Sequence, residues 1–163
     1  MHRPRVYVET TIPSFYFDER CDPKIVAQRQ STREWWQRAV TRWELVTSVA
    51  VWSEILRGPE HRQGQWIGLL RDLTLLALEP RIRATEATYI AQKVMPARLD
   101  GDALHLAFAS HYKCDYLVTW DFRHLANANK FQHIRRVNAK LGLFVPQIVT
   151  PRELMEVEDD RED

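Results

Sequence analysis

Short hydrophobic runs alternate along the chain with segments whose apolar residues recur at helical spacing. The short runs indicate strands, because they are rich in β-branched and aromatic residues. The predicted strands cover residues 5–8, 45–49, 75–78, 116–120 and 144–149. The predicted helices cover residues 23–41, 51–57, 65–73, 83–94, 102–112 and 127–141, with a last helical turn at 151–154. This alternation predicts an α/β fold with a mostly parallel central sheet, right-handed crossovers and helices on both faces.

Several residues mark where these elements begin and end. Asp22 followed by Pro23 is a strong helix start, with Asp as the N-cap and Pro at the first helical position. Gly142 is placed to end the helix before it. The segment 10–14 (TTIPS) is expected to break the chain after the first strand. Residues 102–112 (DALHLAFASHY) are apolar around most of the helix circumference, which predicts a buried helix.

The composition is that of an ordinary globular protein, with 45% apolar and 28% charged residues. No run approaches the roughly 20 apolar residues of a membrane helix. The N-terminus lacks the apolar stretch of a signal peptide, so we expect a cytoplasmic protein. Cys21 and Cys114 match no metal or redox spacing, and the six histidines form no zinc motif.

Charge is distributed unevenly along the chain. The formal net charge is +1, but residues 157–163 (VEDDRED) hold five acids and one arginine. The remainder is therefore mildly basic, which is compatible with nucleic-acid binding. We expect one domain over residues 1–156 and a disordered acidic tail over residues 157–163.

Four carboxylates stand where predicted strands end or predicted helices begin. Glu9 follows the first strand, Glu54 lies in the helix after the second, Asp102 opens the buried helix, and Asp121 follows the strand 116–120. The carboxyl ends of parallel strands meet at one edge of a sheet, so these groups are expected to converge. Taken singly, each has a structural explanation; Asp102, for example, would cap its helix. Clustered carboxylates repel unless a cation neutralises them, and oxygen ligands favour Mg²⁺ or Mn²⁺.

The residues around these acids resemble a known family. The phrases that carry the resemblance are VETTIPSFY, SEILRG, DALHLAFASHYKCDYLVTWDFRHLAN and PQIVTPRELME. From about Val6 to Leu154 the chain resembles bacterial PIN-domain proteins, the group that includes VapC-type toxins. The resemblance implies a single PIN-like domain and a metal-dependent ribonuclease whose four acids are Glu9, Glu54, Asp102 and Asp121. It also implies a homodimer, and often a small antitoxin protein as partner.

The resemblance suggests roles for several polar residues. Thr10 or Thr11 would supply a hydroxyl to the site, and Thr119 and Asn127 match polar positions of the family pattern. His105 lies three positions after the third acid and shares its helical face. This histidine is either a proton relay or a hydrogen-bonded residue of the core, and the sequence leaves both interpretations open.

One departure from the family pattern concerns the first acid, which is usually Asp. In this chain Glu9 moves the carboxylate outward by about 1.5 Å, roughly one C–C bond. We expect Glu9, Asp102 and Asp121 to hold one or two divalent ions, Mg²⁺ or Mn²⁺, with Glu54 bound directly or through water.

RNA as a substrate would need cations near the acids. Arg57, Arg123, His124 and Lys130 follow the elements that carry the acids, and we expect Arg123 to contact RNA because it lies two residues after Asp121. The tryptophans would stack on bases, fill the core or lie at an interface, and most are expected in the core or at an interface; they are Trp35, Trp36, Trp43, Trp52 and Trp66.

Two other functions are compatible with an α/β fold of this kind. A PIN-like domain without efficient catalysis would serve as an RNA-binding or scaffold protein, and the replacement of Asp by Glu9 fits that alternative. A phosphatase of the haloacid-dehalogenase type would need a DxD motif after the first strand. Residues 8–11 (VETT) lack that motif, which argues against the phosphatase.

Overall fold

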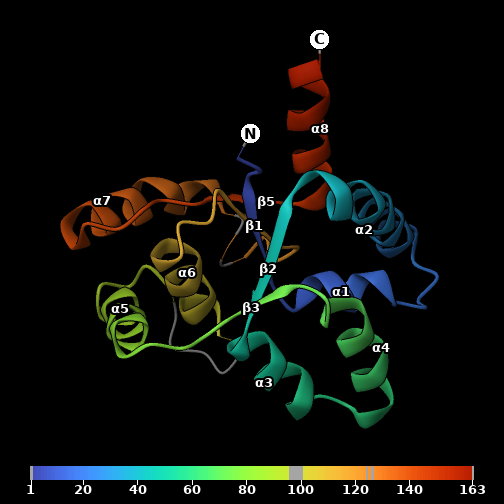
Figure 1. Cartoon of the computed structure of the whole chain (residues 1–163), viewed down its shortest axis with the longest axis horizontal. Coiled ribbons are helices and arrows are strands. Elements are labelled where there is room, and N and C mark those ends of the chain that lie inside the picture. Colours follow the sequence, from blue (N-terminus) through green and yellow to red (C-terminus); the bar gives the residue numbers. More distant parts are fainter. Residues whose placement is uncertain (1, 96–100, 124, 126, 163) are drawn as a thin grey trace.

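A parallel β-sheet lies at the centre of the molecule. The computed structural model describes residues 2–95, 101–123, 125 and 127–162. These residues form a five-stranded, all-parallel sheet in the order β3-β2-β1-β4-β5 (Figure 1). The strands are β1 (Arg5–Val8), β2 (Glu44–Ser48), β3 (Thr74–Leu76), β4 (Tyr116–Val118) and β5 (Gln147–Val149). The predicted α/β fold with a parallel sheet is confirmed.

Helices cover both faces of this sheet. They are α1 (Thr11–Tyr16), α2 (Pro23–Arg42), α3 (Val49–Arg57), α4 (Glu60–Leu70), α5 (Pro80–Ala91), α6 (Asp102–His111), α7 (Phe131–Leu141) and α8 (Pro151–Glu162). A 3₁₀ turn, η1 (Ala128–Lys130), precedes α7. Figure 1 shows α5, α6 and α7 on one side of the sheet and α1, α2 and α4 on the other.

The central strands end at the same level, and this places the segments that follow them side by side. Val8 at the end of β1 pairs with Val118 at the end of β4. Both strands are buried, as expected for the middle of a parallel sheet covered on two faces. On the other side of β1, Ser48 ends β2 and caps α3, accepting hydrogen bonds from the N–H groups of Ala50 and Val51. The chain therefore leaves three neighbouring strands at one edge.

The predicted buried helix is α6. All its residues from Asp102 to Ser110 are buried, which agrees with its apolar circumference. The predicted caps are also present: Asp22 accepts from the N–H of Lys24 at the start of α2, and Gly142 ends α7 in the left-handed conformation. These signals were local, so the sequence alone was enough to find them.

The segment expected to break the chain after β1 is instead the short helix α1. Pro13 lies in its first turn, where backbone N–H groups have no partner within the helix, so the proline does not prevent it. Helix α4 begins at Glu60 and ends at Leu70, five residues earlier at its start than the predicted 65–73. The helix predicted at 83–94 is α5, which begins at Pro80 and already ends at Ala91.

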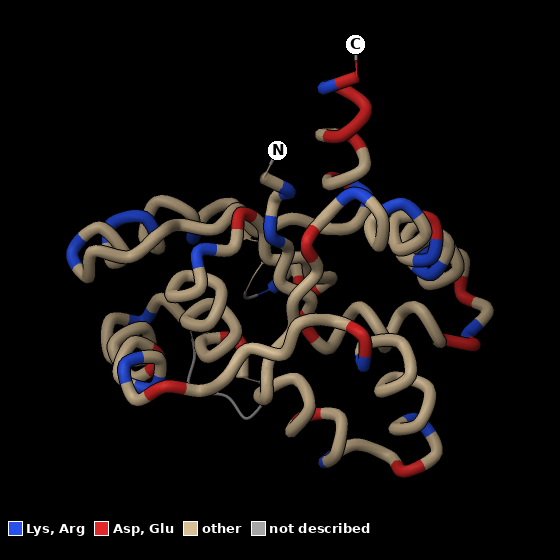
Figure 2. The backbone as a smooth tube through the Cα atoms, in the orientation of Figure 1, with Lys and Arg blue, Asp and Glu red and all other residues tan. Residues whose placement is uncertain are grey.

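The acidic tail is the clearest correction, because α8 continues through Glu162 where disorder was predicted over 157–163. Figure 2 shows the acids of α8 and the basic residues of the neighbouring α2. Arg42 forms ion pairs with Glu158 and Glu162, at 2.9 and 3.1 Å. The indole N–H of Trp43 donates to Glu158 at 3.2 Å. These contacts with a distant segment account for the helix, although its composition is that of a solvated tail.

Within the described ranges, no helix combines the length and the hydrophobicity that a membrane span requires.

Candidate active site

The four predicted acids come together at the carboxyl edge of the sheet. Glu9 follows β1, Glu54 lies on α3 after β2, Asp102 is the first residue of α6, and Asp121 follows β4. All four line one open cleft of about 330 Å³. The other lining residues are Thr10, Thr11, Ser14 and Trp66. The predicted convergence of distant carboxylates is therefore present in the structure.

Glu9 is buried and held by its neighbour Thr11. One carboxylate oxygen, Oε1, accepts from the backbone N–H of Thr11 at 2.9 Å and from its hydroxyl. The same hydroxyl oxygen accepts from the N–H of Trp120 at 2.9 Å, which ties the end of β1 to the end of β4. Thr11 therefore fixes Glu9 relative to β4, the strand that Asp121 follows.

The environment of Glu9 disfavours its charge. Burial raises the pKa of this carboxyl to about 7, and the nearby Glu54 contributes in the same direction, while His105 and Thr11 oppose the shift. Among the described residues, no lysine or arginine forms an ion pair with Glu9. A cation at this position would therefore relieve an unfavourable buried charge.

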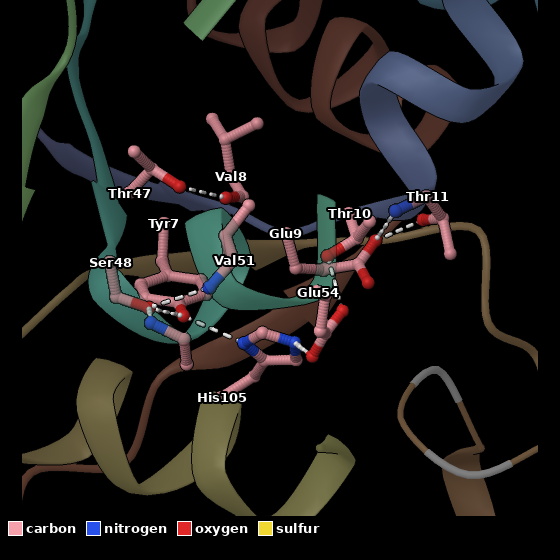
Figure 3. Close-up of polar contacts among 11 residues, drawn as sticks. Tyr7, Val8, Glu9, Thr10, Thr11, Thr47, Ser48, Val51, Glu54 and His105 are labelled. Carbon is pink, nitrogen blue, oxygen red and sulfur yellow. Dashed lines mark hydrogen bonds and ion pairs between the residues drawn. The ribbon is translucent and has the colours of Figure 1, made fainter. Parts of the chain in front are cut away.

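Glu54 is held at both carboxylate oxygens (Figure 3). Oε1 lies 2.6 Å from Nε2 of His105, and Oε2 accepts from the hydroxyl of Thr10. Gly101 makes room for this carboxylate: a Cβ atom there would lie 2.6 Å from Oε1. Thr10 and Thr11 thus have separate tasks, because each anchors a different acid.

His105 connects Glu54 with the core of the protein. It is fully buried, and its Nδ1 lies 2.7 Å from the hydroxyl oxygen of Tyr7, which in turn lies 2.6 Å from Ser48 Oγ. Burial alone would lower the pKa of His105, but the carboxylates, Glu54 first among them, outweigh burial and raise it. The histidine is therefore both a core residue and a partner of the site.

Asp102 and Asp121 complete the set of acids that line the cleft. Asp102 is buried at the start of α6, but the N-cap is Gly101, so the simple capping role considered for Asp102 is not observed. Asp121 is half-buried, and its Oδ1 accepts from the N–H of Arg123 at 3.0 Å. Thr119 Oγ1 accepts from the N–H of Asp121 at 2.9 Å and so shapes the turn that presents this acid.

Two of the polar residues suggested by the family pattern do not line the cleft. Thr119 is fully buried beneath the Asp121 turn. Asn127 caps η1 by accepting from the N–H of Asn129, and its amide donates to the carbonyl oxygen of Arg123. Both residues hold the loop after β4. His124, one of the expected cations, lies outside the described residues.

A sequence model of the PIN domain matches residues 7–130, which include all four acids and most of the sheet. The chain belongs to the PIN domain family. No curated protein sequence matches it.

Three solved structures have a similar fold. This PIN domain is similar to VapBC2 from Rickettsia felis, solved with a DNA fragment from its promoter, at TM-score 0.57 and 14% identity over 90% of this chain and 98% of the other. It is similar to VapBC-1 from nontypeable Haemophilus influenzae at TM-score 0.53 and 17% identity, over 90% and 98% of the two chains. A toxin–antitoxin complex from Klebsiella pneumoniae gives TM-score 0.50 and 17% identity, over 77% and 93%. At these identities the likeness concerns the fold.

The donor set of the PIN cleft suits a hard divalent cation. Its acids offer oxygen atoms, and the buried carboxyl of Glu9 would be stabilised as an anion by such an ion. The spacing is looser than coordination requires, since within the described ranges no three His, Cys, Asp or Glu side chains are close enough to hold one metal ion. The residues therefore fit a metal by chemistry, and their side chains would have to draw closer to bind it.

Two cleft residues were missed or left undecided at the level of sequence. Ser14 lies four positions after Thr10 on α1, so helical spacing could have placed it on the same face. Of the five tryptophans considered for base stacking, Trp35, Trp36 and Trp43 are buried, whereas the half-buried Trp66 lines the cleft. No pattern in the sequence distinguishes Trp66 from the others.

Proposed function

We propose that this PIN domain is a divalent-metal-dependent endoribonuclease that cleaves RNA in the acidic cleft. The observation that supports this most directly is the meeting of four carboxylates from four separate segments in one cleft. Glu9, Asp102 and Asp121 would hold Mg²⁺ or Mn²⁺, while Glu54 is engaged by His105 and Thr10. A bound divalent ion lowers the pKa of its water and stabilises the charge that develops on the phosphate.

The protein's own residues arrange the cleft for this reaction. Thr11 holds Glu9, Thr10 holds Glu54, and the turn at Thr119 presents Asp121. These anchors reduce the freedom of three carboxylates before substrate arrives, and such preorganisation lowers the barrier for a hydrolytic step.

The path of the RNA would follow two further clefts that adjoin the acidic one. One, of about 550 Å³, shares Ser14 and Trp66 with it and is also lined by Arg62. The other, of about 490 Å³, shares Glu54 and is also lined by Arg57. Neither arginine forms an ion pair with the described residues, so both are placed to contact phosphates. Arg123 is exposed next to Asp121 and completes this set.

The test is Mn²⁺-dependent cleavage of RNA by the wild type, by Asp102→Asn and by Asp121→Asn. Each substitution should reduce the cleavage rate by about 100-fold or more, because a metal ligand is lost, and should leave the melting temperature unchanged or raised. Asp115→Asn is the matched control: Asp115 precedes β4 at the opposite end of the sheet and accepts from the N–H of Arg5. Cleavage that persists in both site variants would refute the proposal.

A second candidate function is an RNA-binding or scaffold protein with weak or no catalysis. The spacing of the acids supports it, as does the replacement of Asp by Glu9. Calorimetric titration with Mn²⁺ separates the two functions. A nuclease should bind the ion and cleave RNA until a chelator is added, whereas a scaffold would bind RNA without either effect.

We also propose that the protein is the toxin of a toxin–antitoxin pair and forms a homodimer. The similar solved structures are toxin–antitoxin complexes, which supports a small antitoxin protein as partner. The experiment is to co-purify the chain with the product of a neighbouring small gene and to measure whether cleavage is inhibited. Sedimentation of the isolated chain tests the dimer.

A further inference from the structure

A line of polar side chains in close contact runs from the core to the acidic cleft. It passes from Ser48 through Tyr7 and His105 to Glu54, with distances of 2.6, 2.7 and 2.6 Å, and ends at the hydroxyl of Thr10 (Figure 3). Ser48, Tyr7 and His105 are fully buried. Such a line is costly unless each group is paired, so its presence under the site calls for an explanation.

The direction of the contact between His105 and Glu54 is fixed by chemistry. An ionised carboxylate only accepts hydrogen bonds, so Nε2 of His105 must carry the proton that faces Glu54. Nδ1 either accepts from the Tyr7 hydroxyl, when the imidazole is neutral, or donates to it, when the imidazole is charged. The tyrosine hydroxyl and Ser48 accommodate both cases, so the contact with Glu54 does not depend on the charge of the histidine.

Both oxygens of Glu54 are thus engaged by the protein, and this distinguishes it from the other acids of the cleft. A carboxylate has about four lone-pair sites, so two remain after the contacts with His105 and Thr10. Gly101 allows this arrangement, because any side chain there would collide with Glu54 Oε1. Glu54 is therefore held at a fixed place on the wall of the cleft by a hydrogen bond from Thr10 and by its close ion-pair contact with His105.

We propose that His105 is a positioning residue that holds Glu54 outside the ligand set of the metal, where its remaining lone pairs orient the attacking water. This inference rests on the proposed nuclease function and assigns different tasks to the four acids. Glu9, Asp102 and Asp121 would hold the ion, and Glu54 would accept a hydrogen bond from the water. Tyr7 and Ser48 set the tautomer and orientation of His105.

Two substitutions of His105 distinguish a role in positioning Glu54 from a role in packing the core. In His105→Gln the amide nitrogen can replace Nε2 as a donor to Glu54, whereas in His105→Asn the shorter amide reaches only the position of Nδ1, near Tyr7. We expect His105→Asn to reduce kcat by about 100-fold, the scale of a misplaced catalytic group, and His105→Gln to lose less than about 10-fold. KM and the Mn²⁺ affinity from calorimetry should stay within about twofold in both variants, because the ligands of the ion are untouched.

A readout without catalysis tests the contact itself. In nitrogen-15 spectra of histidine-labelled, metal-free protein, Glu54→Gln should shift the His105 Nε2 resonance, and Asp121→Asn should leave it in place. An unchanged resonance in Glu54→Gln would overturn the inference. So would equal losses of kcat in His105→Asn and His105→Gln, or a loss of Mn²⁺ binding in His105→Asn. A wild type that cleaves no RNA with Mn²⁺ would instead refute the proposed function, and the spectra would still decide whether His105 holds Glu54.

Discussion

Gly101 lies directly against Glu54, so that a Cβ atom at position 101 would come within 2.6 Å of the carboxylate oxygen Oε1. Gly101 also has a φ of +75°, a conformation that L-residues adopt at a cost of about 1–2 kcal/mol. The glycine therefore meets two requirements at once: it starts α6 and leaves space for an acid of the cleft.

The substitution Gly101→Ala separates these two requirements when it is compared with Gly142→Ala. Gly142 has a similar φ of +69°, but a Cβ atom at position 142 would meet nothing within 4 Å. Both variants should lose about 1–2 kcal/mol of stability in urea unfolding. RNA cleavage should fall by about tenfold or more only in Gly101→Ala, because only there is Glu54 displaced. Equal activity in the two variants would show that the position of Glu54 is unimportant.

Glu9 gives the metal-free protein a characteristic dependence on pH. Its carboxyl has a pKa of about 7 in the folded protein against 4.5 ordinarily, chiefly because of burial. Between these values the folded state binds more protons than the unfolded state, so stability falls as pH rises from about 4.5 to 7 and is level above that. The loss amounts to about 3 kcal/mol, counting 1.36 kcal/mol for each pKa unit.

The variant Glu9→Gln should remove most of this dependence and raise the melting temperature at pH 7.5 in the presence of a chelator. The control is Glu19→Gln, at an exposed position, which should retain the wild-type profile. Melting temperatures between pH 4.5 and 8 measure both. If the stability of Glu9→Gln fell with rising pH as much as that of the wild type, another group would cause the pH dependence. In the wild type, Mn²⁺ should raise the melting temperature most at high pH, where Glu9 is charged.

The general arrangement of the site could be predicted from the sequence because it follows from topology. Glu9 and Asp121 each follow a hydrophobic run, and parallel strands bring such positions to one edge. The partner of each acid could not be predicted in this way. His105 shares a helical face with Asp102, yet it binds Glu54, which belongs to another element. Choosing between these partners requires the distance between α3 and α6, and no local pattern encodes that distance.

Composition was misleading where a distant segment supplies the stabilising contacts. The residues 157–162 contain mostly acids, a pattern typical of disorder, but they form helix because Arg42 at the end of α2 and the indole of the following Trp43 contact them. Local sequence was also misleading for α1, where Pro13 favoured a break in the chain rather than a helix. In both cases the local sequence tolerates the helix, and tertiary contacts decide.

The contact between Trp43 and Glu158 can be tested by substitution. Glu158→Ala leaves the largely buried indole N–H without its acceptor, and this should cost about 1 kcal/mol in urea unfolding. Asp160→Ala, an exposed acid on the same helix, should change stability by less than about 0.5 kcal/mol. Neither variant should change RNA cleavage, because α8 lies away from the cleft. Equal stability of the two variants would indicate that the end of α8 contributes nothing to the fold.

Trp66 should contribute to RNA binding rather than to the chemical step. It lines both the acidic cleft and the adjoining cleft that carries Arg62, so a base that leaves the site would meet its ring. Stacking on an aromatic side chain contributes about 1–3 kcal/mol per base. Trp66→Ala should therefore raise the Kd for a short single-stranded RNA by about tenfold, measured by fluorescence anisotropy in a chelator, whereas Trp66→Phe should retain most of the affinity.

The role of Arg62 can be tested by the salt dependence of RNA binding, because a contact with a phosphate makes the affinity fall as the salt concentration rises. Arg62→Ala should reduce the slope of log Kd against log salt concentration by about 1, and Trp66→Ala should leave that slope unchanged. Phe144→Ala is the control for loss of an exposed aromatic ring, since Phe144 follows α7 and does not line either cleft. If Phe144→Ala weakened RNA binding as much as Trp66→Ala, the RNA would have to follow a different surface.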